Sequence, residues 1–192
     1  MSLSVEESEM ALRHFRESGA LLEGHFVLRS GRHSGHFFQC AQVCQYLERI
    51  SELASLIVRE TSEWNFETVL SPAMGGLVIG QEVARQAKAR FIFAEKVEDR
   101  LELRRNFRIG KGERVLVVED VITRGGRVDE ALAILEATEA KPAGVAVMVD
   151  RSDGAVDFGV PLFSLVRLSF PTFEAGQVPA SIAVIPPTKP GS

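Results

Sequence analysis

The sequence is poor in cysteine, in long apolar runs and in excess charge of either sign. Its 2 cysteines, Cys40 and Cys44, lie too close together to cross-link a fold of 192 residues, so we expect free thiols. No apolar run approaches the ~18 residues of a membrane span. The first ten residues, MSLSVEESEM, are acidic where a secretory signal would be basic and then apolar. We therefore expect a cytoplasmic protein with no membrane partner.

Net charge and chain length narrow the class of protein further. Lys and Arg number 22 and Asp and Glu 26, which gives a net charge of −4 and a pI of about 5.7. This is the wrong sign for a protein whose main task is to bind nucleic-acid phosphates. The composition, 45% hydrophobic and 25% charged, is close to the globular average, and the length fits a single domain, 1–192, with its own core.

Apolar periodicity predicts strands that alternate with helices. Short apolar strands are expected at 68–72, 90–96, 114–120, 143–150 and 162–166, and helices at 4–19, 47–58, 77–89 and 127–137. This alternation indicates an α/β fold with a central, mainly parallel sheet flanked by helices. The runs HFVLRS and HFFQC, around the turn GRHSG, predict a small hairpin apart from that sheet. The polar stretch 97–114 is expected to be either a mobile functional loop or a solvated hairpin.

The segment VLVVEDVITRGG contains the most informative residues. Glu119 and Asp120 end a buried strand, and Thr123, Gly125 and Gly126 lead into a helix. In open parallel sheets ligands bind at this end of the strands, and a helix N-terminus suits a phosphate. Two carboxylates beside a phosphate site would repel a polyphosphate unless they bind hydroxyl groups or a metal ion. They therefore indicate a ribose phosphate with Mg²⁺ as the ligand. The structural alternative is an ordinary tight turn with acidic residues at a helix start.

This segment resembles the phosphoribosyl pyrophosphate (PRPP) signature of type I phosphoribosyltransferases, in the Asp-Val-Ile-Thr form of the orotate enzymes. Four more stretches resemble the same family and occur in the same order. LRSGRHSGHFF resembles the orotate-side hairpin, and LSPAMGGLVIG resembles the pyrophosphate loop. FAEK resembles the strand end with a PRPP-binding lysine, and MVDRSDG resembles the strand end with an orotate-contacting arginine. The resemblance implies transfer of phosphoribose from PRPP to orotate, giving orotidine 5′-monophosphate and pyrophosphate in pyrimidine synthesis. It also implies a PRPP-binding core at about 65–170 and a hood at about 19–45 that includes C-terminal residues.

The resemblance implies a role for each matching residue. Asp120, Lys96, Arg104 and Arg105 are the expected catalytic residues. The expected PRPP-binding residues are Glu119, Asp120, Val121, Ile122, Thr123, Arg124, Gly125, Gly126, Arg127 and Lys96. The expected orotate-binding residues are Thr123, Arg151, Phe37, Phe38 and Arg29. Mg²⁺ is expected to be held mainly through PRPP, with no dedicated protein ligands, and a homodimer with shared active sites is implied.

Each role has a plainer alternative. Thr123 could be a helix N-cap, Lys96 a solvated strand-end residue, and the loop arginines a charged hairpin tip. Asp150 could pair with Arg151, and the two phenylalanines could belong to the core. The string His33, His36, Cys40, Cys44 has zinc-ligand types, but no single regular element gathers all four.

The sequence departs from the family pattern at four places, and two other functions stay open. Gly75 and Arg29 stand where lysines are common, Gly35 where a proline is, and DRLELRRNFR replaces the usual catalytic loop, so the loop residue that acts on pyrophosphate is left open. The alternatives are another phosphoribosyltransferase, such as a purine-specific one, and a PRPP-sensing regulator that acts on nucleic acid. The net charge of −4 and the lack of an added helix-turn-helix segment disfavour the regulator.

Overall fold

The computed structural model describes residues 3–28 and 30–190. None of the helices in these ranges is long and apolar enough to cross a membrane. Both cysteines are free thiols, as expected.

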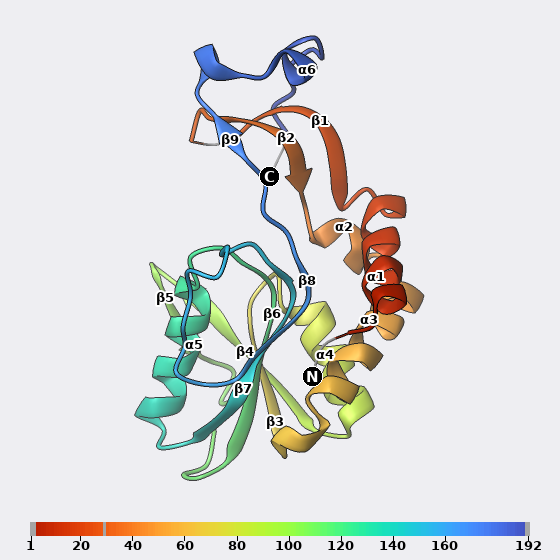
Figure 1. Cartoon of the computed structure of the whole chain (residues 1–192). Coiled ribbons are helices and arrows are strands. Elements are labelled where there is room, and N and C mark those ends of the chain that lie inside the picture. The colour runs from red at the N-terminus through yellow and green to blue at the C-terminus, as the bar shows by residue number, and fades with distance from the viewer. Residues whose placement is uncertain (1–2, 29, 191–192) are drawn as a thin grey trace.

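A six-stranded sheet forms the centre of the molecule (Figure 1). All neighbouring strands run parallel except the first pair, which is antiparallel. In spatial order the strands are β5 (Arg100–Leu103), β4 (Arg90–Val97), β3 (Thr68–Pro72), β6 (Arg114–Ile122), β7 (Lys141–Asp150) and β8 (Leu162–Arg167). The predicted α/β fold and all five predicted strands are confirmed. For the polar stretch 97–114 the hairpin alternative is confirmed over its first residues, because β5 folds back antiparallel on β4.

Helices cover both faces of this sheet (Figure 1). One face packs against α5 (Gly126–Ala137), and the other against α1 (Val5–Glu17), α3 (Leu47–Glu60) and α4 (Leu77–Ala87). Side chains alternate along each strand, so Val117 packs in the cluster beneath α5 while Val118 packs with the other three helices. The sheet is therefore buried on both faces, which is why its strands read as continuous apolar runs. The remaining short elements are α2 (Ala41–Cys44) and two 3₁₀ turns, Ser62–Trp64 and Ala175–Gln177.

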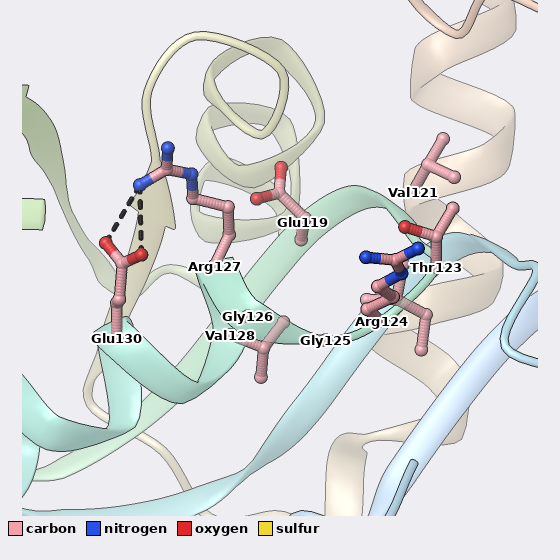
Figure 2. A pocket seen from close by; sticks show the side chains of 10 residues that line it. Glu119, Val121, Thr123, Arg124, Gly125, Gly126, Arg127, Val128 and Glu130 are labelled. Atoms are coloured by element: carbon pink, nitrogen blue, oxygen red, sulfur yellow. Dashed lines mark hydrogen bonds and ion pairs between the residues drawn. The ribbon is translucent and has the colours of Figure 1, made fainter. Parts of the chain in front are cut away.

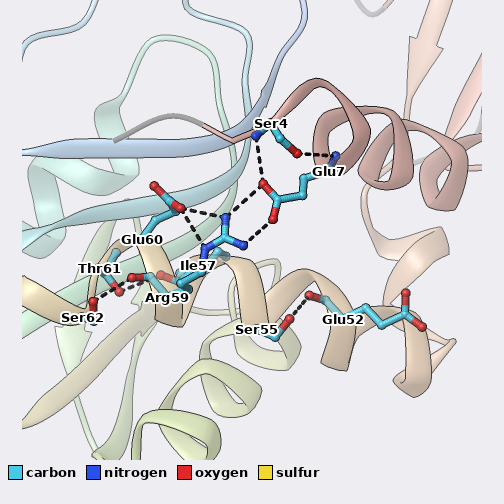
Figure 3. A network of polar contacts seen from close by, with 9 residues as sticks. All are labelled: Ser4, Glu7, Glu52, Ser55, Ile57, Arg59, Glu60, Thr61 and Ser62. Atoms are coloured by element: carbon cyan, nitrogen blue, oxygen red, sulfur yellow. Dashed lines mark hydrogen bonds and ion pairs between the residues drawn. The ribbon is translucent and has the colours of Figure 1, made fainter.

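Helix α1 begins with a capping box and is tied to α3 (Figure 3). The Ser4 hydroxyl accepts a hydrogen bond from the Glu7 backbone N–H at 3.2 Å, and the Glu7 carboxylate accepts one from the Ser4 N–H at 2.9 Å. Arg59 of α3 donates to the same carboxylate and also to Glu60, at 2.8 Å. The predicted N-terminal helix is thus confirmed, and its first turn is anchored to the helical layer of the core.

A separate three-stranded antiparallel sheet, here called the hood sheet, lies beyond the carboxyl ends of the core strands (Figure 1). Its strands are β1 (Leu21–Val27), β2 (His33–Phe38) and β9 (Thr172–Phe173), with α6 (Ala180–Ala183) packed beside β1. The predicted hairpin is confirmed; β9 and α6 were not predicted. Arg32 at the hairpin turn donates to the hydroxyl and the carbonyl of Thr172, both at 2.8 Å. The hood therefore joins the N-terminal hairpin to a segment some 140 residues later in the chain.

Candidate active site

The chain reverses its winding direction between β3 and β6. From β3 it crosses to β4 on one side, and β6 then pairs with β3 on the other side. Ligands in open α/β sheets bind in the crevice that such a reversal leaves beyond the carboxyl ends of the strands. The segment 73–76 follows β3 at this point, and the segment 119–127 ends β6 and begins α5. The two motifs that the sequence analysis singled out therefore meet at the position where the fold favours a ligand.

A cavity of about 270 Å³ lies at the start of α5 (Figure 2). Its lining residues are Glu119, Val121, Ile122, Thr123, Arg124, Gly125, Gly126, Arg127, Val128 and Glu130. The first turn of α5 has backbone N–H groups that no helical carbonyl can accept, and the helix dipole favours negative charge there. The predicted PRPP-binding residues of this segment, with the exception of Asp120, thus share one cavity with the properties of a phosphate site.

Gly125 gives this cavity its shape. It is the N-cap of α5 and has φ +79°, a conformation that residues with a Cβ rarely adopt. A Cβ atom added at Gly125 would lie 2.8 Å from the Phe158 ring. The turn therefore requires glycine at position 125 for two reasons: its positive φ angle and its close contact with Phe158. The alternative in which Thr123 caps α5 is wrong, because Gly125 is the N-cap and Thr123 is exposed at the turn.

Glu119, which is buried, and Asp120, which is half-buried, form a carboxyl pair at the end of β6. The Asp120 N–H donates to Glu119 Oε1 at 3.0 Å, and the Val121 N–H donates to Asp120 Oδ1 at 2.8 Å. Burial, followed by the charge of Asp120, raises the pKa of Glu119 to about 9, and burial also raises the pKa of Asp120. The pair is therefore costly to ionise without a hydroxyl donor or a cation beside it. A ribose phosphate with Mg²⁺ supplies both a hydroxyl donor and a cation.

The loop after β3 approaches this pair closely. A Cβ atom added at Gly75 would lie 2.6 Å from Asp120 Oδ1, and one at Gly76 would lie 2.8 Å from the Val118 carbonyl oxygen. At Gly76 a larger residue would require the backbone to move, whereas at Gly75 it would require the Asp120 carboxylate to turn away. A side chain at position 75, where related sequences often have lysine, would therefore displace the Asp120 carboxylate from its position in this structure.

A salt-bridge network links the cavity to the β4–β5 hairpin. Arg127 donates to both carboxylate oxygens of Glu130, at 3.1 and 2.8 Å (Figure 2). The same carboxylate accepts the backbone N–H of Leu101 in β5 at 2.8 Å. Glu130 therefore connects a predicted phosphate-binding arginine to the hairpin that leads to Arg104 and Arg105. The sequence analysis missed Glu130; its position one helical turn after Arg127 was the available signal.

The other predicted cations lie along the same hairpin and are not among the residues that line the cavity. Lys96 is half-exposed at the end of β4 and pairs with Asp99 at 3.2 Å. Arg105 makes two hydrogen bonds with Glu95, at 3.0 and 2.9 Å, while Arg104 is exposed. In this conformation the hairpin is charged and solvated, and the structure does not bring these three residues together with the carboxyl pair.

Arg151 lies beside the predicted phosphate turn. Its backbone N–H donates to the Ile122 carbonyl at 2.8 Å, which holds it next to Thr123. Its Nε is buried without a hydrogen-bond partner among the described residues, and burial lowers its pKa. Pairing with Asp150 is wrong, because that carboxylate accepts two hydrogen bonds from Ser152, at 2.8 and 2.6 Å. Arg151 is thus a half-buried cation with an unused donor at the ligand end of the sheet.

The two adjacent phenylalanines of β2 have different environments. Phe38 is 7% exposed and packs edge-to-face on Phe15 of α1, with ring centroids 5.2 Å apart. This places Phe38 in the hydrophobic core rather than in the wall of a pyrimidine site. Strand alternation points Phe37 the other way, where it is half-buried against Phe26. Arg29, the fifth predicted orotate contact, lies outside the described residues.

Comparison with known proteins agrees with this geometry. The phosphoribosyl transferase domain model matches residues 42–158. The orotate phosphoribosyltransferase of Erythrobacter litoralis is 46% identical over 187 residues, which cover 96% of this chain and 97% of the relative. That of Caldanaerobacter subterraneus is 41% identical over 186 residues, which cover 97% of this chain and 98% of the relative. This chain belongs to the orotate phosphoribosyltransferase family.

Solved structures support the fold of this orotate phosphoribosyltransferase family member. A crystal structure of the Mycobacterium tuberculosis orotate phosphoribosyltransferase with inorganic phosphate is 21% identical, with a TM-score of 0.70, and the match covers 86% of this chain and 97% of that one. The Aeropyrum pernix orotate phosphoribosyltransferase is 24% identical, with a TM-score of 0.71, over 83% and 93% of the two chains. Both share the architecture described above.

The side chains of the site show whether they could hold Mg²⁺. The described residues contain no group of three or more His, Cys, Asp or Glu side chains that could hold a metal ion, and the zinc-like string around His33 does not form one. The two carboxyls at the end of β6 directly precede the phosphate turn in the chain. They fit a cation that takes most of its oxygen ligands from a bound substrate and from water, as Mg²⁺ at phosphates usually does.

Proposed function

We propose that this chain transfers the 5-phosphoribosyl group of PRPP to orotate, forming orotidine 5′-monophosphate and pyrophosphate. The observation that carries the proposal is the juxtaposition, at the switch point of the sheet, of the carboxyl pair Glu119–Asp120, the glycine-rich start of α5, and Arg151. Each matches one part of the two substrates: ribose hydroxyls, 5′-phosphate, and the carboxylate of the pyrimidine. The names of the relatives support the same reaction.

The geometry suggests how the chain performs the reaction. The N1 atom of orotate gives up its proton and bonds to C1 of the ribose as the bond from C1 to the pyrophosphate oxygen breaks. The departing pyrophosphate can take up that proton, and the ribose ring carries positive charge in between. The α5 N-terminus and Arg127 hold the 5′-phosphate, while Glu119 and Asp120 accept hydrogen bonds from the ribose hydroxyls. This fixes C1 against the pyrimidine, so catalysis rests on positioning and on preorganised charge rather than on a protein nucleophile.

The cofactor we propose is Mg²⁺, held mainly by PRPP oxygens and approached by the two carboxyls of β6. When bound, this ion would supply positive charge to offset the charge that develops on the departing pyrophosphate. Lys96, Arg104 and Arg105 act on the same leaving group. Because Lys96 and Arg105 are half-exposed or exposed and paired only with Asp99 and Glu95, they can exchange those partners when a polyanion arrives.

Purified protein with orotate, PRPP and Mg²⁺ tests the reaction by the loss of orotate absorbance. Turnover that requires both PRPP and the metal supports the proposal. Adenine and hypoxanthine are assayed in parallel by product analysis, and their use in place of orotate would favour a purine-specific enzyme. Tight PRPP binding with no turnover of any base would favour a PRPP-sensing regulator.

Asp120→Asn tests the role of the carboxyl pair. The amide keeps the shape of the side chain and the acceptor for the Val121 N–H, but it weakens the contact to ribose hydroxyls. We expect a fall in kcat of about tenfold to a hundredfold, the order of losing a hydrogen bond to a charged group, with an unchanged thermal midpoint. Glu63→Asn, at an exposed acidic residue outside the site, is the control. Full activity of Asp120→Asn would contradict the assignment.

We further propose a cytoplasmic homodimer in which the β4–β5 hairpin of one subunit serves the site of the other. The exposure of Arg104 and Arg105, which are not among the residues that line the cavity, supports this arrangement. Mixing the weakly active Asp120→Asn and Arg105→Ala subunits should raise activity above that of either variant alone if sites are shared, because some mixed dimers then hold one intact site. Sedimentation as a monomer, or no restoration, would contradict it.

A further inference from the structure

An aromatic side chain outside every motif of the sequence analysis contacts the predicted orotate-binding arginine. The Phe170 ring centroid lies 5.0 Å from the guanidinium carbon of Arg151. The same ring stacks on His36 of β2, with centroids 4.8 Å apart and planes 8° from parallel. Phe170 thus joins a cation at the end of the core sheet to an imidazole of the hood sheet.

The backbone around Phe170 is fixed at both ends. On the core side, the Leu168 N–H donates to the Asp150 carbonyl at 2.9 Å, one residue before Arg151. On the hood side, the Ser34 hydroxyl donates to the Pro171 carbonyl at 3.3 Å, and Thr172 pairs with Ser34 in the sheet. Phe170 therefore lies on a short strap between two anchored points, which leaves its ring little freedom to leave Arg151.

The contact acts on a guanidinium that has an unused donor. Arg151 Nε is buried and has no hydrogen-bond partner within 3–28 and 30–190, a situation that costs free energy unless a ligand supplies an acceptor. An aromatic face holds the guanidinium plane in one orientation without using any of its N–H groups. A planar anion such as a carboxylate can accept two of these N–H groups side by side, and a neutral pyrimidine edge cannot supply that charge.

We propose that Phe170 is a positioning residue for orotate selectivity: its ring holds Arg151 ready for the substrate carboxylate and, through His36, makes that orientation depend on the docked hood. This inference rests on the proposed function, since it assigns the unused donor to orotate. PRPP binds at the start of α5 and makes no use of the Phe170 contact. The two substrates should therefore respond differently when the ring is removed.

The test is Phe170→Leu, with Phe170→Tyr as the conservative variant and Phe173→Leu as the matched control in the same segment. We expect Phe170→Leu to raise the KM for orotate by about threefold to thirtyfold, the range of a buried cation–π contact. The KM for PRPP should be unchanged, Phe170→Tyr should restore the orotate KM, and Phe173→Leu should leave it as in the wild type. Calorimetry should show the same split, with weaker binding of orotidine 5′-monophosphate and unaltered binding of PRPP.

A second variant covers a failure of Phe170→Leu to fold. His36→Ala leaves Arg151 and Phe170 in place and removes the hood-side contact, so it should raise the orotate KM by less, and His36→Phe should restore it. Equal changes for both substrates would make Phe170 a structural residue and overturn the proposal, as would no change in either. If the wild type itself does not turn over orotate, the proposed function fails; if the wild type is active and the variants match it, this inference alone fails.

Discussion

Replacing Glu119 by Gln should make the protein more stable at neutral and alkaline pH. Glu119 is 5% exposed, and burial together with the Asp120 charge raises its pKa from 4.5 to about 9. Between these two values the folded state holds a proton that the unfolded chain releases. The free energy of unfolding therefore falls as the pH rises through this window. The stabilising contribution of protonated Glu119 is fully present only below the pKa of the unfolded chain.

The size of the effect follows from the same linkage. One proton per molecule changes the free energy of unfolding by about 1.4 kcal/mol per pH unit. At about pH 7.5, some three units above the unfolded value, the wild type has lost at most about 4 kcal/mol relative to a chain that cannot ionise there. The Gln side chain keeps an oxygen that can accept the Asp120 N–H, so the variant retains the hydrogen bond while the charge is removed.

Urea denaturation at about pH 5 and at about pH 8 measures this difference. We expect Glu119→Gln to match the wild type at the lower pH and to exceed it by several kcal/mol at the higher one. Glu63→Gln, at an exposed position, controls for the loss of one negative charge. A gap between Glu119→Gln and wild type that does not widen as the pH rises would refute the reasoning.

Two further substitutions test the turn and the network at α5. Gly125→Ala should lower the free energy of unfolding by about 1–3 kcal/mol, because of the positive φ and the contact with Phe158, and should weaken PRPP binding. Gly176→Ala, at a position outside the site where a Cβ meets none of the described atoms within 4 Å, should do neither. Calorimetry with PRPP and urea titration measure both, and equal effects of the two variants would contradict the argument. Glu130→Ala should lower the free energy of unfolding by about 1 kcal/mol and speed hydrogen exchange at the Leu101 amide. Glu130→Gln keeps an acceptor and should change this exchange little. Unaltered exchange in Glu130→Ala would argue against the link between Glu130 and Leu101.

The regular core was predictable from the sequence because its signals are local. Strands such as 114–120 are continuous apolar runs, the Ser4–Glu7 capping box marks the start of α1, and both appear in the structure where the pattern places them. The carboxyl pair and the glycine turn were predictable as a site for the same reason. They are consecutive in sequence and lie at a strand-to-helix junction.

The parts that could not be predicted depend on contacts between distant residues. β9 has only two residues and exists because β2 offers them a pairing edge. Phe37 and Phe38 are alike in sequence, and only the packing of α1 against β2 decides that Phe38 is the core residue. The role of Phe170 depends on His36 and Arg151, which come from opposite ends of the chain, and no periodicity indicates such a contact.

The construction of the hood sheet from both ends of the chain has a consequence for synthesis on the ribosome. Arg32 and its partner Thr172 are 140 residues apart, so at about 5–20 residues per second the hairpin emerges about 7–28 s before β9 does. During that interval β2 has an unpaired edge, which is a template for pairing with another chain. Slower translation lengthens this exposure, and the yield of native protein should then depend on how well the nascent hairpin is shielded until the last strand arrives.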